Sequence, residues 1–204
     1  MSPRPYTLGR REAAAVETRA RILDAARRLL GAESGPGGFS IDAVAREADV
    51  ARMTVYHQFG SRVGLLEALF DDLARRGGLD ALPALFTQAD AGAALEDLVA
   101  AFCRFWGSDP TVLRRLRAAA ALDPDLVEAL RARDERRRRG LQVLCERLAP
   151  GRGAGAGAGR DAVDLLTALT SFETYDSLAQ TREPAAVCAL VLRAARAILV
   201  AEPA

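Results

Sequence analysis

The clearest pattern of hydrophobic and polar positions lies between Phe39 and Phe59, in the stretch FSIDAVAREADVARMTVYHQF. After Ser40, a good N-cap residue, apolar residues recur at helical spacings and form one buried face. Asp49 offers a break, because Asp tolerates a left-handed turn better than most residues. A second short helix is expected over residues 51–57. Two short helices joined by a tight turn predict a helix-turn-helix, whose second helix can lie in a DNA major groove.

The second of these helices separates its side chains by face. Val50, Val55 and Phe59 can pack inward on the preceding helices. The outward side chains have chemistry that suits DNA: Arg can bond a guanine edge through two donors, and Thr or Met can touch a thymine methyl. Tyr and Thr hydroxyls suit phosphate oxygens. The outward set is Arg52, Met53, Thr54, Tyr56 and His57.

Helical patterns also surround this motif. A stripe with Ile22 and Leu30 predicts a helix over residues 18–32, and Ser61 can cap a helix that reaches about Arg76. Residues 150–159 read PGRGAGAGAG, which is typical of a flexible linker. Further helices are expected over residues 91–106, from 110, over 124–149, over 161–181 and from 184 onward.

Composition changes this picture only slightly. Half of the chain is hydrophobic and its net charge is +1, so the strongly basic footprint of many DNA-binding domains is missing. Phosphate binding would then depend on a few local contacts. The cysteines, Cys103, Cys145 and Cys188, have no metal-binding spacing and are interpreted as small buried hydrophobes, with a redox sensor as the less favoured alternative. No apolar run resembles a signal peptide or a membrane span, so a cytoplasmic protein is expected.

The first residues of the chain lack an apolar period and contain Pro and Gly. We expect residues 1–17 to form a flexible basic arm. Arg10 and Arg11 could reach a minor groove or a phosphate, as basic arms do. A solvated tail is the equally good alternative, and the residues leave both open.

The order of residues in and after the motif resembles the TetR (tetracycline-repressor) family of bacterial transcription regulators. The family usually has Gly where this chain has Asp49 and Ser where it has Ala51; Asp49 is therefore expected to take over the cap of the second helix. With the basic residue that follows Ser61, the predicted DNA contacts are Ser40, Arg52, Met53, Thr54, Tyr56, His57 and Arg62. The residues that carry the resemblance are Ala45, Ala48, Val50, Thr54, Val55, Tyr56, Phe59, Ser61 and Leu65–Leu66.

The resemblance implies an all-α fold with two domains. Residues 18–66 would be a three-helix DNA-binding domain with the helix-turn-helix, and residues 67–204 a helical effector-binding and dimerisation domain. It further implies a homodimer through the two C-terminal helices, a palindromic DNA operator, a small-molecule effector and, in most members, repression. A dimer also makes physical sense, because one short recognition helix reads few base pairs.

Candidate effector contacts lie on the apolar faces of the C-terminal helices, where plain core packing is the alternative for each. The helical period also places Asp134 and Arg137 on an inward face. We favour the interpretation that the helix leaves the core here and that RARDERRRR is a solvated run; a polar patch in a ligand pocket is the alternative. The candidates are Phe102, Trp106, Leu116, Arg137, Phe172 and Tyr175.

Two other classes of function compete with a regulator. An enzyme is not expected: the one histidine, His57, lies on the presumed recognition helix, and no strained nucleophile turn or third group accompanies it. No cofactor or metal is expected either. A helical adaptor that binds only protein remains the alternative, although it would not need the outward Arg-Met-Thr-Tyr-His face.

Overall fold

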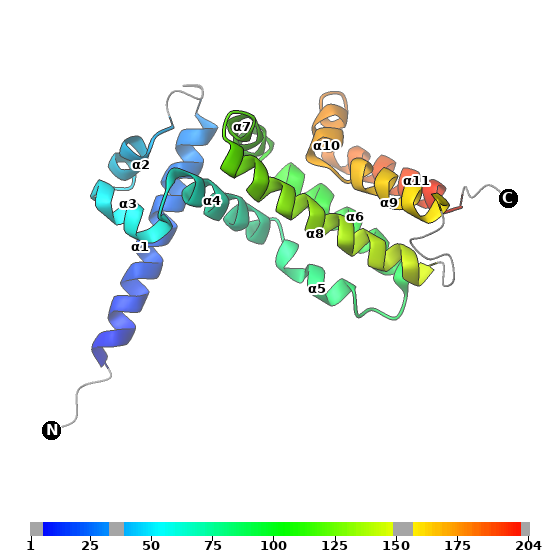
Figure 1. The fold of residues 1–204 in the computed structure, drawn as a ribbon, viewed down its shortest axis with the longest axis horizontal. Coiled ribbons are helices and arrows are strands. Elements are labelled where there is room, and N and C mark those ends of the chain that lie inside the picture. Colours follow the sequence, from blue (N-terminus) through cyan, green and yellow to red (C-terminus); the bar gives the residue numbers. More distant parts are fainter. Residues whose placement is uncertain (1–5, 33–38, 149–156, 201–204) are drawn as a thin grey trace. The chain divides into compact units, whose positions relative to one another are not determined.

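A computed structural model describes residues 6–32, 39–148 and 157–200, and within these ranges every regular element is a helix (Figure 1). This confirms the predicted all-α class. The helices are α1 (Tyr6–Gly31), α2 (Ile41–Glu47), α3 (Arg52–Phe59), α4 (Arg62–Arg76), the 3-10 helix η2 (Leu79–Ala81), α5 (Leu82–Leu85), α6 (Ala91–Ser108), α7 (Pro110–Ala120), α8 (Pro124–Leu148), α9 (Gly157–Leu169), α10 (Phe172–Ala179) and α11 (Pro184–Val200). Across those same ranges, none of the helices is both long and apolar enough to cross a membrane.

The chain forms two compact units. Residues up to Asp72 join Thr111–Val127 in the first unit, and Leu73–Pro110 joins the residues from Glu128 onward in the second. These units differ from the contiguous division expected at residues 66 and 67. The physical reason is that Arg115 of α7 donates to the carbonyl oxygens of Leu30, at 2.7 Å, and of Ala32, at the C-terminal end of α1.

The first unit packs α2 and α3 beside α1, as Figure 1 shows. The apolar stripe of α1 is buried at Ile22, Ala26 and Leu30, as its spacing predicts. Val44 of α2 and Val55 of α3 are fully buried as well. Burying each of the large apolar side chains contributes roughly 1.5–3 kcal/mol of free energy. This burial stabilises short helices that would be marginal in isolation.

The start of α1 corrects the prediction of a flexible arm. The helix begins at Tyr6, not at Thr18, so residues 6–17 are helical, while residues 1–5 lie outside the described part. The backbone of Arg10 and Arg11 is helical, and their side chains are not described. Ala13–Ala15 are strong helix formers, and residues 12–17 are exposed, so this extension needs no apolar period.

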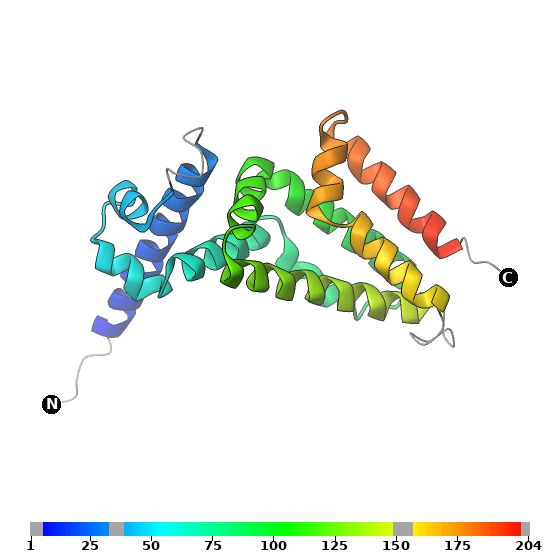
Figure 2. The same ribbon diagram turned by 45° about the horizontal axis from the view of Figure 1, so that its top comes forward.

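The second unit is built around α6, which packs against α5, α10 and α11. Its side chains Leu98, Val99 and Phe105 are almost fully buried. Figure 2 shows α9 and α11 side by side. The helix expected over residues 161–181 is in fact two helices, because the chain breaks at Thr170 and Ser171 and restarts with Ser171 as the N-cap of α10.

Candidate functional site

The helix-turn-helix begins with a side-chain cap. Ser40 has an extended backbone, and its hydroxyl oxygen accepts a hydrogen bond from the Ala43 N–H at 3.1 Å, as a good N-cap does. Ser40 itself is exposed, as is Asp42 in the first turn of α2. The start of α2 therefore presents both a hydroxyl and a carboxylate to solvent.

Asp49 makes the turn between the two helices, as predicted. Its φ is 52°, the left-handed region, and the Val50 N–H donates to the Ala45 carbonyl at 3.0 Å. The expectation that Asp49 also caps α3 is wrong. Ala51 is the N-cap residue of α3, and no side-chain hydrogen bond caps it. The aspartate serves the turn through its backbone, and its tolerance of positive φ replaces that of glycine.

The two faces of α3 are separated as the sequence predicts. Val55 is fully buried, whereas Arg52, Met53 and His57 are exposed, and Met53 keeps 59% of its surface in contact with solvent. Thr54 and Tyr56 are half-buried. The exposed Met53 side chain has the apolar chemistry that a contact with a thymine methyl group requires.

Arg52 is held in place on this face. Its Nη1 donates to Asp42 Oδ2 at 3.2 Å, and its Nη2 donates to the Tyr56 hydroxyl at 3.3 Å. The guanidinium carbon lies 5.5 Å from the centre of the Tyr56 ring. The hydrogen bond to the Tyr56 hydroxyl and the charge of Asp42 raise the pKa of Arg52, so its charge is secure. Asp42 and Tyr56 thus each contact one terminal nitrogen of its planar donor fork.

Arg62, at the start of α4, is also engaged within the first unit. Its Nη1 lies 3.4 Å from Asp123 Oδ2, and its guanidinium lies 5.7 Å from the centre of the Phe39 ring. Ser61 caps α4, as expected, by accepting from the Gly64 N–H at 3.0 Å. A phosphate would compete with the Asp123 carboxylate for Arg62.

Three contacts around α3 and the start of α4 were not predicted from the sequence. Asp42 and Asp123 pair with the predicted Arg52 and Arg62, and Arg19 of α1 donates to the Gln58 carbonyl at 3.0 Å and lies over the Phe59 ring. Each joins residues that are distant in sequence. The outward polar position of Asp42 in the first turn of α2 is the one signal that could have drawn attention to it.

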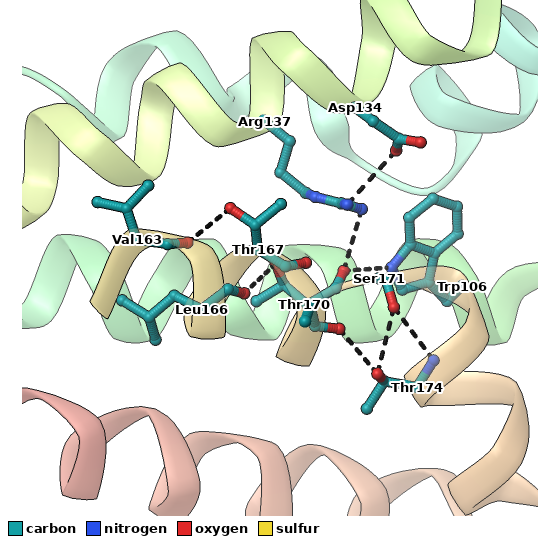
Figure 3. A network of polar contacts seen from close by, with 10 residues as sticks. Trp106, Asp134, Arg137, Val163, Leu166, Thr167, Thr170, Ser171 and Thr174 are labelled. Atoms are coloured by element: carbon teal, nitrogen blue, oxygen red, sulfur yellow. Dashed lines mark hydrogen bonds and ion pairs between the residues drawn. The ribbon is translucent and has the colours of Figure 1, made fainter. Parts of the chain in front are cut away.

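In the second unit, the break between α9 and α10 gathers polar groups from three helices (Figure 3). The Thr170 carbonyl accepts from Trp106 Nε1 at 3.0 Å and from Arg137 Nη1 at 3.3 Å. Arg137 Nη2 lies 3.4 Å from Asp134 Oδ1. The favoured interpretation of a solvated run is wrong for Arg137, whose side chain is 6% exposed, while that of Asp134 is 37% exposed. Arg137 is buried because its guanidinium has partners there. It donates to the Thr170 carbonyl, and its central carbon lies 5.6 Å from the centre of the Phe102 ring.

A small hollow lies beside this break. It encloses only about 10 Å³, roughly the space of one water molecule, and its lining includes Phe102, Cys103, Trp106, Thr170, Tyr175 and Val191. Three predicted effector contacts, Phe102, Trp106 and Tyr175, thus share one hollow. Phe172 and Arg137 contact its wall, with the Phe172 ring 5.6 Å from that of Trp106. Leu116 is fully buried in the first unit and does not line the hollow.

Two of the cysteines, Cys103 and Cys145, hold their protons more tightly than a free thiol does. Burial, above all, raises the pKa of Cys103 to about 12 and that of Cys145 to about 11. Cys103 is buried beside Cys188, which is half-buried. Among the described residues, no group of three or more His, Cys, Asp or Glu side chains could hold a metal ion.

The geometry of the first unit defines a class of protein. Two short helices, a left-handed turn and an exposed polar face on the second helix are the parts of a DNA-binding helix-turn-helix. Residues 22–69 match the family model of bacterial regulatory proteins, tetR family. Residues 22–69 therefore form a DNA-binding helix-turn-helix segment of the type found in TetR-family regulators, as the resemblance of the motif predicts.

Solved structures agree on the fold. The TetR-family transcriptional regulator PfmR from Thermus thermophilus is 22% identical, with 90% of this chain and 96% of that chain covered and a TM-score of 0.59. NalD from Pseudomonas aeruginosa, described as the secondary repressor of the MexAB-OprM multidrug efflux pump, is 22% identical, with 89% and 95% covered and a TM-score of 0.63. EbrR, described as a multidrug binding protein complexed with imidazole, is 24% identical, with 91% and 96% covered and a TM-score of 0.54. Comparison with curated protein sequences found no significant match.

Proposed function

We propose that this regulator is a ligand-responsive repressor that binds a palindromic operator as a homodimer. The observation that carries the proposal is the ordered guanidinium of Arg52 on the exposed face of α3. An arginine fork already fixed in direction loses little conformational freedom when it meets a guanine edge. We assign base reading to Arg52, with Met53 and Thr54 beside thymine methyl groups.

Phosphate binding is assigned to the polar residues around this fork. Hydroxyl groups and cations at the edges of a recognition helix position the protein on the duplex but carry no sequence information. Since the net charge of the chain is only +1, these local contacts must supply the attraction to DNA. The residues assigned to phosphate are Ser40, Tyr56, His57 and Arg62.

A homodimer would double the contact with DNA. One α3 can read only a few base pairs, whereas a C2 dimer reads two half-sites. The proposed interface is made by the two C-terminal helical segments, α9 with α10, and α11. Support comes from Leu165 of α9, which is 55% exposed, and from half-exposed Leu192 and Ile198 of α11. Exposed large apolar side chains on neighbouring helices are typical of protein–protein contact.

An effector would act through the second unit. The hollow beside Trp106 is the proposed site, and EbrR, with the same fold, is described as a multidrug binding protein. The ligand must bind the state with low DNA affinity better than the other state, or no release follows. Because the target is DNA, we propose that the protein acts in the cytoplasm.

The test is a selection of random duplex DNA by the purified protein at moderate salt, with sequencing of what it retains. An enriched palindrome is expected, and its half-site spacing would report the separation of the two recognition helices. The Arg52→Ala variant is the matched control. Absence of enrichment in a folded sample, shown by circular dichroism, would favour the protein-binding adaptor instead.

A further inference from the structure

We propose that Asp123 competes with DNA for the guanidinium of Arg62 and thereby limits the affinity for every DNA sequence. In the free protein the Asp123 carboxylate pairs with Arg62, and a DNA phosphate takes its place on binding. This inference rests on the phosphate role proposed for Arg62 and names what regulates that contact. It depends on three features of the first unit: a loose ion pair, a helix cap that keeps Asp123 in place and an aromatic ring beside Arg62.

The ion pair joins the start of α4 to the turn before α8. Arg62 Nη1 lies 3.4 Å from Asp123 Oδ2, and the two side chains are 40% and 23% exposed. Charge-assisted hydrogen bonds between a guanidinium and an anion are shorter, at roughly 2.7–2.9 Å. Ion pairs that solvent reaches contribute little to stability. A phosphate oxygen that approaches to the shorter distance can therefore displace the Asp123 carboxylate.

Asp123 keeps other partners when Arg62 leaves. It precedes Pro124, the first residue of α8, and its carbonyl accepts from the Val127 N–H at 2.9 Å. Its Oδ1, which is not the oxygen beside Arg62, accepts from the Leu126 N–H at 3.4 Å. This is the position of an N-cap, where the helix dipole favours a negative charge. The carboxylate thus remains stabilised at the start of α8 after the exchange.

A ring contact keeps Arg62 near the start of α4. Its guanidinium carbon lies 5.7 Å from the centre of the Phe39 ring, which is almost fully buried. A cation over an aromatic face is attracted to the ring. This contact does not involve Asp123, so it can persist whichever anion pairs with Arg62. The exchange therefore changes the anion and leaves the cation in place.

Charge is the reason that the two anions compete. One guanidinium neutralises one carboxylate or one phosphate, and two anions brought together around it repel each other. While it pairs with Asp123, Arg62 adds no net charge to the attraction for DNA, in a chain whose net charge is only +1. The exchange involves a phosphate and not a base edge. Asp123 therefore lowers the affinity for specific and for random DNA by the same factor.

The experiment titrates the full-length protein with a random-sequence duplex at several salt concentrations. Asp123→Asn should bind roughly two- to fivefold more tightly, which is the range expected for the loss of one exposed ion pair. Asn caps helices as well as Asp does, so α8 should keep its start. Arg62→Gln should bind more weakly, and the magnitude of its slope of log affinity against log salt should fall by about one.

The double variant tests the competition itself. In the Arg62→Gln background, Asp123→Asn should change the affinity no more than the control Asp125→Asn does, because no guanidinium is left to release. Asp125 is an exposed carboxylate in the first turn of the same helix, so its removal measures the effect of overall charge. Circular dichroism checks that each variant is folded.

Unchanged or weaker binding by Asp123→Asn would overturn the competition, and weaker binding would mean that the carboxylate positions Arg62 for DNA. A gain as large without Arg62 as with it would overturn the competition as well, since Asp123 would then act through overall charge. Both results leave the proposed phosphate role of Arg62 intact. An Arg62→Gln variant with unchanged affinity and salt slope would refute that role, and this inference with it. Because the duplex is random, the test does not depend on finding a palindromic operator.

Discussion

Asp42, in the first turn of α2, accepts a hydrogen bond from Arg52, the first residue of α3, across 3.2 Å. The pair is exposed on both sides, so its contribution to stability is small. Its consequence is orientation: the acidic residue of the first helix and the Tyr56 hydroxyl together set the direction of the predicted base-reading fork. The predictions for the DNA interface follow from this arrangement.

Arg52→Ala should relax base preference at one position in each half-site. Loss of a bidentate contact to guanine should lower the affinity for DNA with the preferred base by roughly 5- to 150-fold. The affinity for DNA with another base at that position should fall much less. The measurement is DNA selection followed by titration of single-base variants of the enriched site. An equal loss for all sequences would show that Arg52 contacts phosphate instead.

Asp42→Asn should weaken base discrimination at the same position while it strengthens binding to random DNA. The neutral amide no longer holds the guanidinium by charge, and the loss of one negative charge reduces repulsion from the phosphates. Titrations with specific and random duplexes over a range of salt concentrations test both effects. Glu47→Gln is the control. Glu47 lies on the same helix as Asp42, and its exposed carboxylate pairs with Arg28 of α1. If both variants behave alike, Asp42 acts only through overall charge.

Tyr56→Phe should weaken binding to all sequences, because the lost hydroxyl is assigned to phosphate. The same hydroxyl also accepts from Arg52, so part of the loss can concern the guanine position. That part should disappear in the Arg52→Ala background, which a double-mutant cycle measures. If Tyr56→Phe changes the selected motif even without Arg52, the phosphate assignment does not hold.

Gly64→Ala should disturb the junction between α3 and α4. A Cβ at Gly64 would overlap the carbonyl oxygen of Phe59, the last residue of α3, so one of the two helix ends must move. Overpacking against backbone costs typically about 1–3 kcal/mol of unfolding free energy, measured by urea denaturation. Gly31→Ala is the control, since its Cβ would meet only Val112 at an ordinary 3.4 Å. A Gly64→Ala variant as stable as the parent would show that this junction adapts freely.

The unfolding free energy should fall as the pH rises above about 9. Burial raises the pKa of Cys103 from 9.0 to about 12, so the folded protein keeps a proton that the unfolded chain has released. The stabilisation is therefore complete below the unfolded pKa and is lost as the pH rises toward the folded one. The chain has no lysine, which leaves cysteines and tyrosines as the side chains that titrate in this range.

Urea denaturation between about pH 8 and pH 10, under reducing conditions, tests this slope. Cys103→Ala should flatten it, and Cys145→Ala should do so to a similar extent, because both folded thiols stay protonated in this pH range. An unchanged slope in Cys103→Ala would mean that its thiol is not shielded in the folded protein.

Features that arise within one helix or one turn could be predicted from residue types alone. Ser40 as a cap, Asp49 as the left-handed residue and Val55 as the buried side of α3 all follow from residue types at local spacings. Hydrophobic periodicity is a local property, so the all-α class and most helices could be predicted. The family match agrees with this local motif.

Contacts between residues of different helices could not be predicted, because they depend on how the helices pack. The pairing of Asp42 with Arg52, the place of Arg115 at the end of α1 and the inward position of Arg137 join separate helices. The break at Thr170 is of the same kind, since its carbonyl is held by donors from α6 and α8. Periodicity shows which face of a helix is apolar but not which helix covers it, and a buried polar group is stable only where partners from other helices reach it.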